Sequence, residues 1–156
     1  MTSVFTKIIN GELPGRFVYR DDKVAAFLTI EPVAYGHTLV VPIQEVDKWT
    51  DLDAETWAHC NAVAQKVGAA VIDVFGSERA GYLIAGFEVP HAHIHVFPAN
   101  DMSGYSLQNI MRADDTDPAE MDAAEVAHPV VMVAGHIDHP GPFAGHAEDF
   151  LHHVVV

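Results

Sequence analysis

The sequence is poor in basic residues, in cysteine and in long apolar stretches, and each shortage excludes a class of protein. Eight lysines and arginines stand against 22 aspartates and glutamates, which gives a formal net charge of -14 with neutral histidines. Because this charge repels nucleic acid and no basic stripe offsets it, binding to DNA or RNA is nearly excluded. The single cysteine cannot form an internal disulfide and no basic-then-apolar leader opens the chain, so we expect a reducing, cytoplasmic setting. The longest apolar runs are far too short to span a membrane, so we expect no membrane partner.

The chain has 156 residues, of which 49% are apolar, and this fits one globular domain with a real core. Its charge is unevenly spread. Residues 1–112 hold all eight basic residues, whereas residues 113–156 hold nine acidic residues, no lysine or arginine, and six of the eleven histidines. This change near Arg112 predicts a conventional domain over residues 1–112, followed by an acidic, histidine-rich C-terminal extension of unclear role over residues 113–156.

The spacing of apolar residues predicts an α+β fold, with an antiparallel sheet of about five strands and two helices. A short helix is expected over residues 4–9 and a long one from Thr50 or Asp53 to Gly76. Strands are expected over residues 17–19, 24–28, 36–41, 82–85 and 92–97. Cys60 lies on the apolar stripe of the long helix, which predicts a core residue rather than a nucleophile.

Three histidines alternate with apolar residues in the segment His91-Ala92-His93-Ile94-His95. In a strand, alternate residues share one face, so their imidazoles are expected to line up at intervals of about 6 to 7 Å, opposite a buried apolar face. Such a row rarely serves packing alone. Two kinds of chemistry stay open. The rings could supply two ligands of a metal site, or one ring could be a nucleophile or general base while a protonated neighbour attracts an anion such as phosphate.

Four segments in sequence carry a resemblance to a known family. They run from Val4 to Pro14, from Ala26 to Pro32, from Gly36 to Pro42, and from His91 to Phe97. The last segment, with its histidines alternating with apolar residues, has the pattern after which the histidine triad (HIT) family is named. The chain resembles this family over roughly residues 3–100.

The resemblance implies a HIT-like fold, a homodimer, and a nucleotidyl hydrolase or transferase whose partner is a small-molecule nucleotide. The substrate would carry a substituent on its α-phosphate, as in a nucleoside phosphoramidate, a dinucleoside polyphosphate or an adenylyl ester. By position, His93 would attack phosphorus and form a covalent nucleotidyl-histidine intermediate, and His95 would donate to a phosphate oxygen. His91 and His37 would support these two rings. Because such chemistry depends mainly on positioning and charge, no cofactor is required.

The same resemblance assigns the substrate-binding residues. Residues at base-pocket positions, which could equally fill the core, are Phe5, Ile8, Phe27 and Ile30. Thr29 stands where relatives commonly hold the ribose hydroxyls with an acid, and Phe87 stands where many carry a glutamine that assists the leaving group. Glu88 beside it could take over a proton transfer or could simply be an exposed loop acid. Because Thr29 and Phe87 depart from the family pattern, the alternative function is a nucleotide-binding regulatory module with little turnover.

Family members often carry a structural zinc, and here the sequence departs from the pattern again. Ser3 and Thr6 stand at two cysteine positions, and Glu45 stands at the position of a common histidine ligand. His91 is then the only remaining candidate ligand, so we expect no metal at this place.

Overall fold

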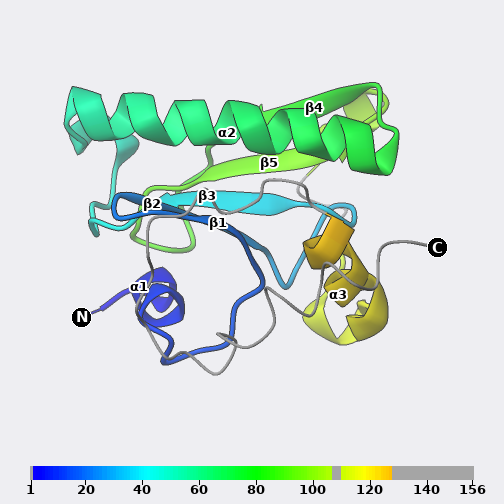
Figure 1. The fold of residues 1–156 in the computed structure, drawn as a ribbon, viewed down its shortest axis with the longest axis horizontal. Helices are drawn as coiled ribbons and strands as arrows, with labels where there is room; N and C mark the ends of the chain where they lie inside the picture. The colour runs from blue at the N-terminus through cyan, green and yellow to red at the C-terminus, as the bar shows by residue number, and fades with distance from the viewer. Residues whose placement is uncertain (1, 107–109, 128–156) are drawn as a thin grey trace.

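The computed structural model describes residues 2–106 and 110–127, which form one antiparallel sheet with helices on both sides (Figure 1). The strands are β1 (Phe17–Arg20), β2 (Val24–Leu28), β3 (Thr38–Pro42), β4 (Arg79–Leu83) and β5 (Ile94–Ala99). They pair in the order β1-β2-β3-β5-β4, and every pair is antiparallel. The helices are α1 (Val4–Ile9), α2 (Ala54–Phe75) and α3 (Pro118–Ala127), with 3-10 turns η1 (Trp49–Asp51), η2 (Met102–Tyr105) and η4 (Ala113–Asp115). The predicted α+β class is confirmed.

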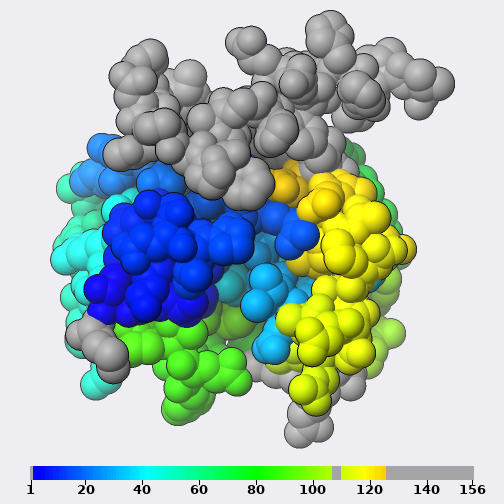
Figure 2. All heavy atoms as spheres, turned by 90° about the horizontal axis from the view of Figure 1, so that it is seen from below, coloured from blue at the N-terminus to red at the C-terminus, as the bar shows by residue number. Residues whose placement is uncertain are grey.

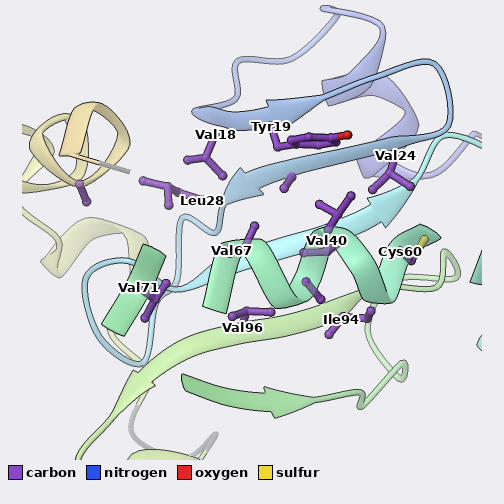
Figure 3. Packing of buried hydrophobic residues seen from close by; sticks show 14 of the residues in the cluster. Val18, Tyr19, Val24, Leu28, Val40, Cys60, Val67, Val71, Ile94 and Val96 are labelled. Atoms are coloured by element: carbon purple, nitrogen blue, oxygen red, sulfur yellow. The ribbon is translucent and has the colours of Figure 1, made fainter. Parts of the chain in front are cut away.

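The main core lies between α2 and one face of the sheet (Figure 3). Successive side chains of a strand point to opposite faces, so Val24, Ala26 and Leu28 of β2 belong to this core. Cys60 of α2 is also part of it, and burial raises the pKa of its thiol to about 11. The prediction that Cys60 is a core residue is therefore confirmed.

A second, smaller core lies between α1 and the opposite face of the sheet. Its buried residues are Phe5, Ile9, Ala25, Phe27, Leu39 and Val41. The rings of Phe5 and Phe27 meet edge to face with centroids 5.7 Å apart. Because α1 has only six residues, it is too short to be stable alone, and its position depends on these contacts.

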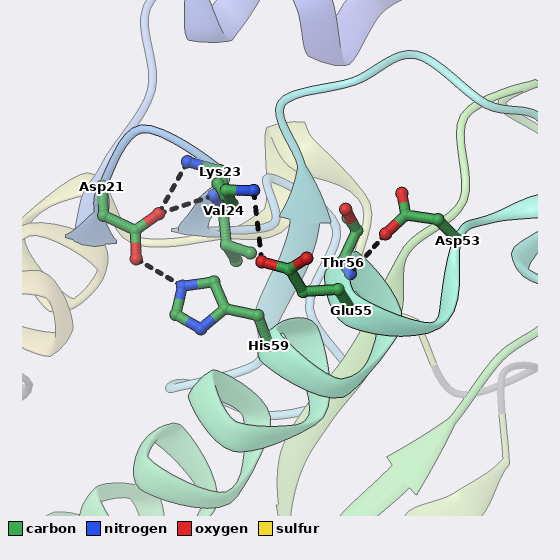
Figure 4. Close-up of polar contacts among 7 residues, drawn as sticks. All are labelled: Asp21, Lys23, Val24, Asp53, Glu55, Thr56 and His59. Atoms are coloured by element: carbon green, nitrogen blue, oxygen red, sulfur yellow. Dashed lines mark hydrogen bonds and ion pairs between the residues drawn. The ribbon is translucent and has the colours of Figure 1, made fainter.

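The N-terminus of α2 is tied to the turn between β1 and β2 (Figure 4). The Asp53 carboxylate caps the helix by accepting the Thr56 N–H at 2.8 Å, which decides between the two caps that the sequence left open. One turn further along, the His59 ring donates from Nε2 to the Asp21 carboxylate at 2.6 Å. The long helix is thus fixed on the sheet at its N-terminal end as well as through the core.

Four strands differ in their bounds from those predicted, and the pairing explains the differences in β4 and β5. β4 begins at Arg79 rather than Tyr82, because its ladder with β5 extends until Arg79 lies opposite Ala99. β5 continues through Pro98, although proline has no N–H for a ladder. β3 pairs with β5 only as far as Val96, so beyond that residue β5 has a neighbour on one side and the proline is tolerated.

α3 adds a helix to the two that the apolar spacing predicted. Its Met121 and Ala124 side chains are buried in the main core, and Arg16 Nε donates to Asp122 Oδ1 at 2.8 Å. Residues 128–156 of the predicted extension lie outside the described residues, and the boundary near Arg112 stays a prediction. Among residues 2–106 and 110–127, no helix has the length and apolar character needed to cross a bilayer.

Candidate functional site

The histidines come together on the α1 side of the sheet, around the start of β5. His95 lies in β5, His91 and His93 lie just before it, and His37 lies just before β3. The register that sets Leu39 opposite His95 brings His37 to the same place. Ring centroids are 4.8 Å apart for His93 and His95, and 5.2 Å apart for His37 and His95.

The predicted alternation holds in this segment, although β5 begins two residues later than expected, at Ile94 rather than Ala92. Ala92 and Ile94 are buried, and Ile94 is part of the main core that faces α2. Phe5 of α1 lies edge-on to the His93 ring, with centroids 4.9 Å apart. The histidine rings therefore project toward α1, away from the main core.

A backbone carbonyl determines which nitrogen of His93 carries the proton. His93 Nδ1 lies 2.7 Å from the carbonyl oxygen of His91, and a carbonyl only accepts, so the proton is on Nδ1. The neutral ring then keeps a lone pair on Nε2. This is the form that a nitrogen nucleophile needs.

A second set of hydrogen bonds orders the protons of His37 and His95. The backbone N–H of Val33 donates to His37 Nδ1 at 3.1 Å, so the proton of His37 is on Nε2. That Nε2–H donates to His95 Nδ1 at 2.9 Å, which leaves the proton of His95 on its own Nε2. His95 thus offers an N–H donor beside the lone pair of His93.

Burial keeps the four rings neutral near pH 7. Burial, followed by repulsion from neighbouring histidines, lowers the pKa of His37 to about 3 and that of His95 to about 4. Burial also lowers the pKa of His93 and of His91. The expected protonated neighbour is therefore absent from the free protein, because a buried charge among these close rings is costly.

The same hydrogen bonds bear on the metal-site interpretation of the histidine row. His37 Nε2, His95 Nδ1 and His93 Nδ1 each take part in a hydrogen bond, and His37 Nδ1 accepts from Val33, so among these three rings a lone pair stays available on His93 Nε2. Within the two stretches that the structure describes, no three or more His, Cys, Asp or Glu side chains form a group that could hold a metal ion. The geometry favours the nucleophile over the metal ligand set.

His91 is held from the N-terminus of α1. Its Nε2–H donates to the Pro42 carbonyl at 2.8 Å, so its Nδ1 accepts the Ser3 hydroxyl at 2.7 Å. The Thr6 hydroxyl donates to Glu45 at 2.5 Å, and the Ser3 N–H lies 3.0 and 3.1 Å from the two Glu45 oxygens. Two hydroxyls, one carboxylate and one imidazole already bonded to one another do not fit the structural zinc that the resemblance implies.

The apolar residues at base-pocket positions lie in different surroundings. Phe5 and Phe27 are buried in the second core, and Ile8 packs against it partly exposed. Ile30 is 62% exposed. Of these residues, Phe5 touches the histidine row directly, and pocket lining by the others stays a prediction.

The polar candidates lie close to the histidines. The Thr29 N–H donates to the His37 carbonyl at 3.2 Å, which places Thr29 at the entrance to β3. Glu88 is exposed, and its charge acts on His93, where it opposes the lowering of the pKa by burial. Phe87 is 96% exposed and contributes nothing to either core. The structure therefore places Thr29 beside the backbone of His37 and Glu88 where its charge acts on His93, and it leaves Phe87 in solvent.

Sequence reasoning missed three groups that hold the site. They are the Ser3 hydroxyl, the Val33 N–H and the Pro42 carbonyl. Ser3 carried a signal, because a serine ahead of a helix predicts an N-cap, and its Oγ does accept the Thr6 N–H at 3.1 Å. Backbone groups give no such signal, since almost every residue offers them.

Seen from the side opposite α2, α1 and α3 frame the connection from β2 to β3 (Figure 2). The Asp117 N–H donates to the Tyr35 hydroxyl at 3.1 Å, and the Met111 N–H donates to the Pro32 carbonyl at 2.9 Å. The chain between β5 and α3 therefore holds this connection, which leads into His37.

Comparison with known proteins agrees with the geometry. A family model described as "HIT domain" matches residues 10–102. The chain is 37% identical to an uncharacterized HIT-like protein of Borreliella burgdorferi over 118 residues, which cover 68% of this chain and 83% of that protein. It is 34% identical to the purine nucleoside phosphoramidase of Escherichia coli, over 60% of this chain and 84% of that protein.

Solved structures give the same result. A zinc-bound histidine triad family protein from Mycobacterium smegmatis is similar with a TM-score of 0.69 and 27% identity, over 83% of this chain and 93% of that chain. A family model that covers most of the chain, relatives of high coverage and a shared fold agree with the histidine row. The chain belongs to the histidine triad (HIT) family.

Proposed function

We propose that the chain is a nucleotidyl hydrolase or transferase that removes a substituent from the α-phosphate of a nucleotide. The substrate is a nucleoside phosphoramidate, a dinucleoside polyphosphate or an adenylyl ester. The observation that carries the proposal is the 2.7 Å hydrogen bond from His93 Nδ1 to the His91 carbonyl, which leaves a lone pair on a neutral Nε2. The name of the Escherichia coli relative, a purine nucleoside phosphoramidase, favours a substrate with a phosphorus–nitrogen bond.

The reaction has two displacements at phosphorus. First, His93 Nε2 attacks phosphorus, the bond to the leaving group breaks, and the leaving group departs with the bonding pair and takes up a proton from water or through Glu88. Second, water attacks phosphorus, the phosphorus–Nε2 bond breaks, and its electron pair returns to His93 while the proton of the water goes to solvent. The product is the nucleoside monophosphate, and His93 is again neutral.

His95 and His37 stabilise the charge that develops on phosphate. The Nε2–H of His95 donates to a non-bridging phosphate oxygen, because its Nδ1 is already occupied by His37 at 2.9 Å. A donor fixed in a site with little water strengthens its bond to the transition state without reorganising. Removing His37 is therefore expected to affect the reaction through the orientation of His95.

The test uses adenosine monophosphate joined through a phosphorus–nitrogen bond to a fluorescent amine. The wild-type protein is expected to release the amine equally well with and without chelator, and His93→Ala to lower kcat by at least about 1,000-fold. Rapid quenching followed by peptide mass spectrometry should find the nucleotidyl group on the peptide that contains His93. His59→Asn, a histidine substitution on α2, across the sheet from the histidine row, is the matched control and should keep full activity.

Each other result has a defined meaning. Equal rates for the wild type and His93→Ala contradict the assignment of the nucleophile. Tight nucleotide binding without turnover supports the regulatory module that Thr29 and Phe87 suggest. Loss of activity with chelator supports a metal-dependent reaction.

We propose further that the chain forms a homodimer through α2 and the outer edge of β4. Within the described residues, no strand pairs with that edge, whereas α3 packs beside the opposite edge strand, β1. A groove of about 480 Å³ runs between α2 and β4, and its lining includes Ala69, Ile72 and Tyr82. Ile72 and Tyr82 are 39% and 45% exposed, so a second copy would cover apolar surface. The setting that we propose is the cytoplasm, where the unpaired Cys60 stays reduced.

A further inference from the structure

Three residues tie the start of α1 to the rest of the site, and we call them the α1 clamp: Ser3, Thr6 and Glu45. Ser3 is 5% exposed, and its Oγ both donates to His91 Nδ1 at 2.7 Å and accepts the Thr6 N–H at 3.1 Å. Glu45, from the chain after β3, accepts the Ser3 N–H and the Thr6 hydroxyl. These hydrogen bonds lower the pKa of Glu45, so its carboxylate stays charged.

His91 connects the clamp to His93. Its ring is fully buried, and both nitrogens are bonded, one to Ser3 and the other to the Pro42 carbonyl. The carbonyl of the same residue accepts the Nδ1–H of His93 at 2.7 Å. The position of the His91 ring is therefore expected to affect the His91 carbonyl oxygen, which decides the tautomer of His93.

The backbone around His91 has other supports. The His91 N–H donates to the Val89 carbonyl at 2.8 Å, and the Ala92 N–H donates to the Val46 carbonyl at 2.7 Å. Loss of the Ser3 hydroxyl is therefore expected to turn or shift the His91 ring without unfolding the segment. The effect on His93 should be a change in orientation and tautomer rather than loss of the site.

The helix that the clamp holds also carries a second contact of His93. Phe5 lies in the first turn of α1, two residues after the N-cap Ser3. Its ring lies edge-on to His93 with centroids 4.9 Å apart. Because α1 is too short to hold itself, the bonds of its first residues to Glu45 and His91 help to keep Phe5 in this place.

We propose that Ser3 is a positioning residue for the reaction at His93, and that the hydrogen bonds of the α1 clamp set the orientation of the His91 ring. The inference rests on the proposed function, because it assigns Ser3 to the reaction of that site. Ser3 touches neither the nucleotide nor phosphorus. It acts through His91, by keeping the His91 carbonyl in line with the His93 Nδ1–H.

The test compares Ser3→Ala, Ser3→Thr and a matched control, Ser77→Ala. Ser77 is also buried, at 7% exposure, and its hydroxyl donates to the Arg79 carbonyl at 3.0 Å, away from the histidines. With the fluorescent phosphoramidate, Ser3→Ala is expected to lower kcat about ten-fold and to change KM by less than about two-fold, since orientation rather than binding is lost. Ser3→Thr keeps the hydroxyl and should restore kcat to within about two-fold of wild type, while Ser77→Ala leaves it unchanged.

A second measurement does not depend on turnover. Nitrogen-15 NMR of the histidine rings should find the neutral His93 ring with its proton on Nδ1 in the wild type. In Ser3→Ala it should find a mixture of the Nδ1–H and Nε2–H tautomers. If Ser3→Ala folds poorly, Ser3→Gly replaces it, because glycine begins a helix nearly as well as serine. An unchanged His93 spectrum, an unchanged kcat, or an equal loss in Ser3→Thr would overturn the proposal. A wild-type protein that does not turn over the probe contradicts the proposed function instead, and the NMR comparison still decides the role of Ser3.

Discussion

At the scale of single residues, two histidines of one segment present different groups on their free nitrogens. His93 keeps its proton on Nδ1 because a carbonyl lies there, and His95 keeps its proton on Nε2 because His37 donates to its Nδ1. One ring therefore offers a lone pair and the other an N–H. The difference comes from the hydrogen-bond partner of each ring, since the two residues are chemically the same.

The burial of His37 makes stability depend on pH. Its pKa is lowered to about 3 in the folded protein, whereas a histidine in the unfolded chain titrates near about 6.5. Between these values the unfolded state binds more protons, so the free energy of unfolding falls as the pH drops from about 6.5 toward about 3.

His37→Gln removes this titration. The variant should be less stable than the wild type at pH 7, but its free energy of unfolding should fall less on acidification, by up to about 1.4 kcal/mol for each pH unit below about 6.5. Urea unfolding at a series of pH values measures both proteins. Parallel curves for the two proteins would show that His37 is not the group responsible.

At the scale of elements, the site depends on where β3 begins. The chain enters β3 through Gly36, whose φ of +95° is a conformation that side chains disfavour. A Cβ at this position would lie 2.3 Å from a ring carbon of Phe75, at the end of α2. Because Gly36 has no side chain, the Phe75 ring at the end of α2 can pack against the backbone just before His37.

Gly36→Ala is expected to destabilise the protein by about 2–4 kcal/mol, because it adds a steric clash to the backbone strain. Gly76→Ala is the matched control, since Gly76 also has a positive φ, of 62°, but no atom lies within 4 Å of its added Cβ. The control should cost only about 1 kcal/mol. Thermal or urea unfolding of the two variants separates the steric clash from the backbone strain. Equal losses of stability in the two variants would refute a role for the Phe75 contact.

At the scale of the whole molecule, the two edges of the sheet have different surroundings. The β1 edge is flanked by α3, whose Asp122 accepts from Arg16 at 2.8 Å. The β4 edge is the one that we propose to be covered by a second copy. An open edge strand beside an apolar groove favours association between chains.

Ile72→Asp places a charge in the groove between α2 and β4 and should weaken the dimer at least about ten-fold, a change of about 1.4 kcal/mol. Ala62→Asp is the control, because Ala62 is exposed on the same helix and does not line the groove. Light scattering after size exclusion should find twice the chain mass for the wild type and for the control. If the wild type is monomeric at roughly tens of micromolar, the proposed dimer is contradicted.

Much of the fold could be predicted from local patterns. The alternation of β2 and the apolar stripe of α2 are each determined by neighbouring residues, because helices and strands have fixed periods. α3 was not predicted, since its helical pattern is weak and its place is set by Met121 and Ala124 packing into a distant core. The end of β5 was also missed, because tolerance of Pro98 depends on how far β3 extends beside it.

By itself, the sequence determined which side chains share a face: the alternation of His91, His93 and His95 places three imidazoles together and away from the main core, because a strand repeats every two residues. Only the tertiary structure decided the protonation and the supports of these rings. His37, Ser3 and the carbonyl of Pro42 reach the row from other parts of the chain, and burial among them lowers the histidine pKa values. A tautomer is chosen by the hydrogen-bond partner of each nitrogen, and such partners exist only after the chain has folded.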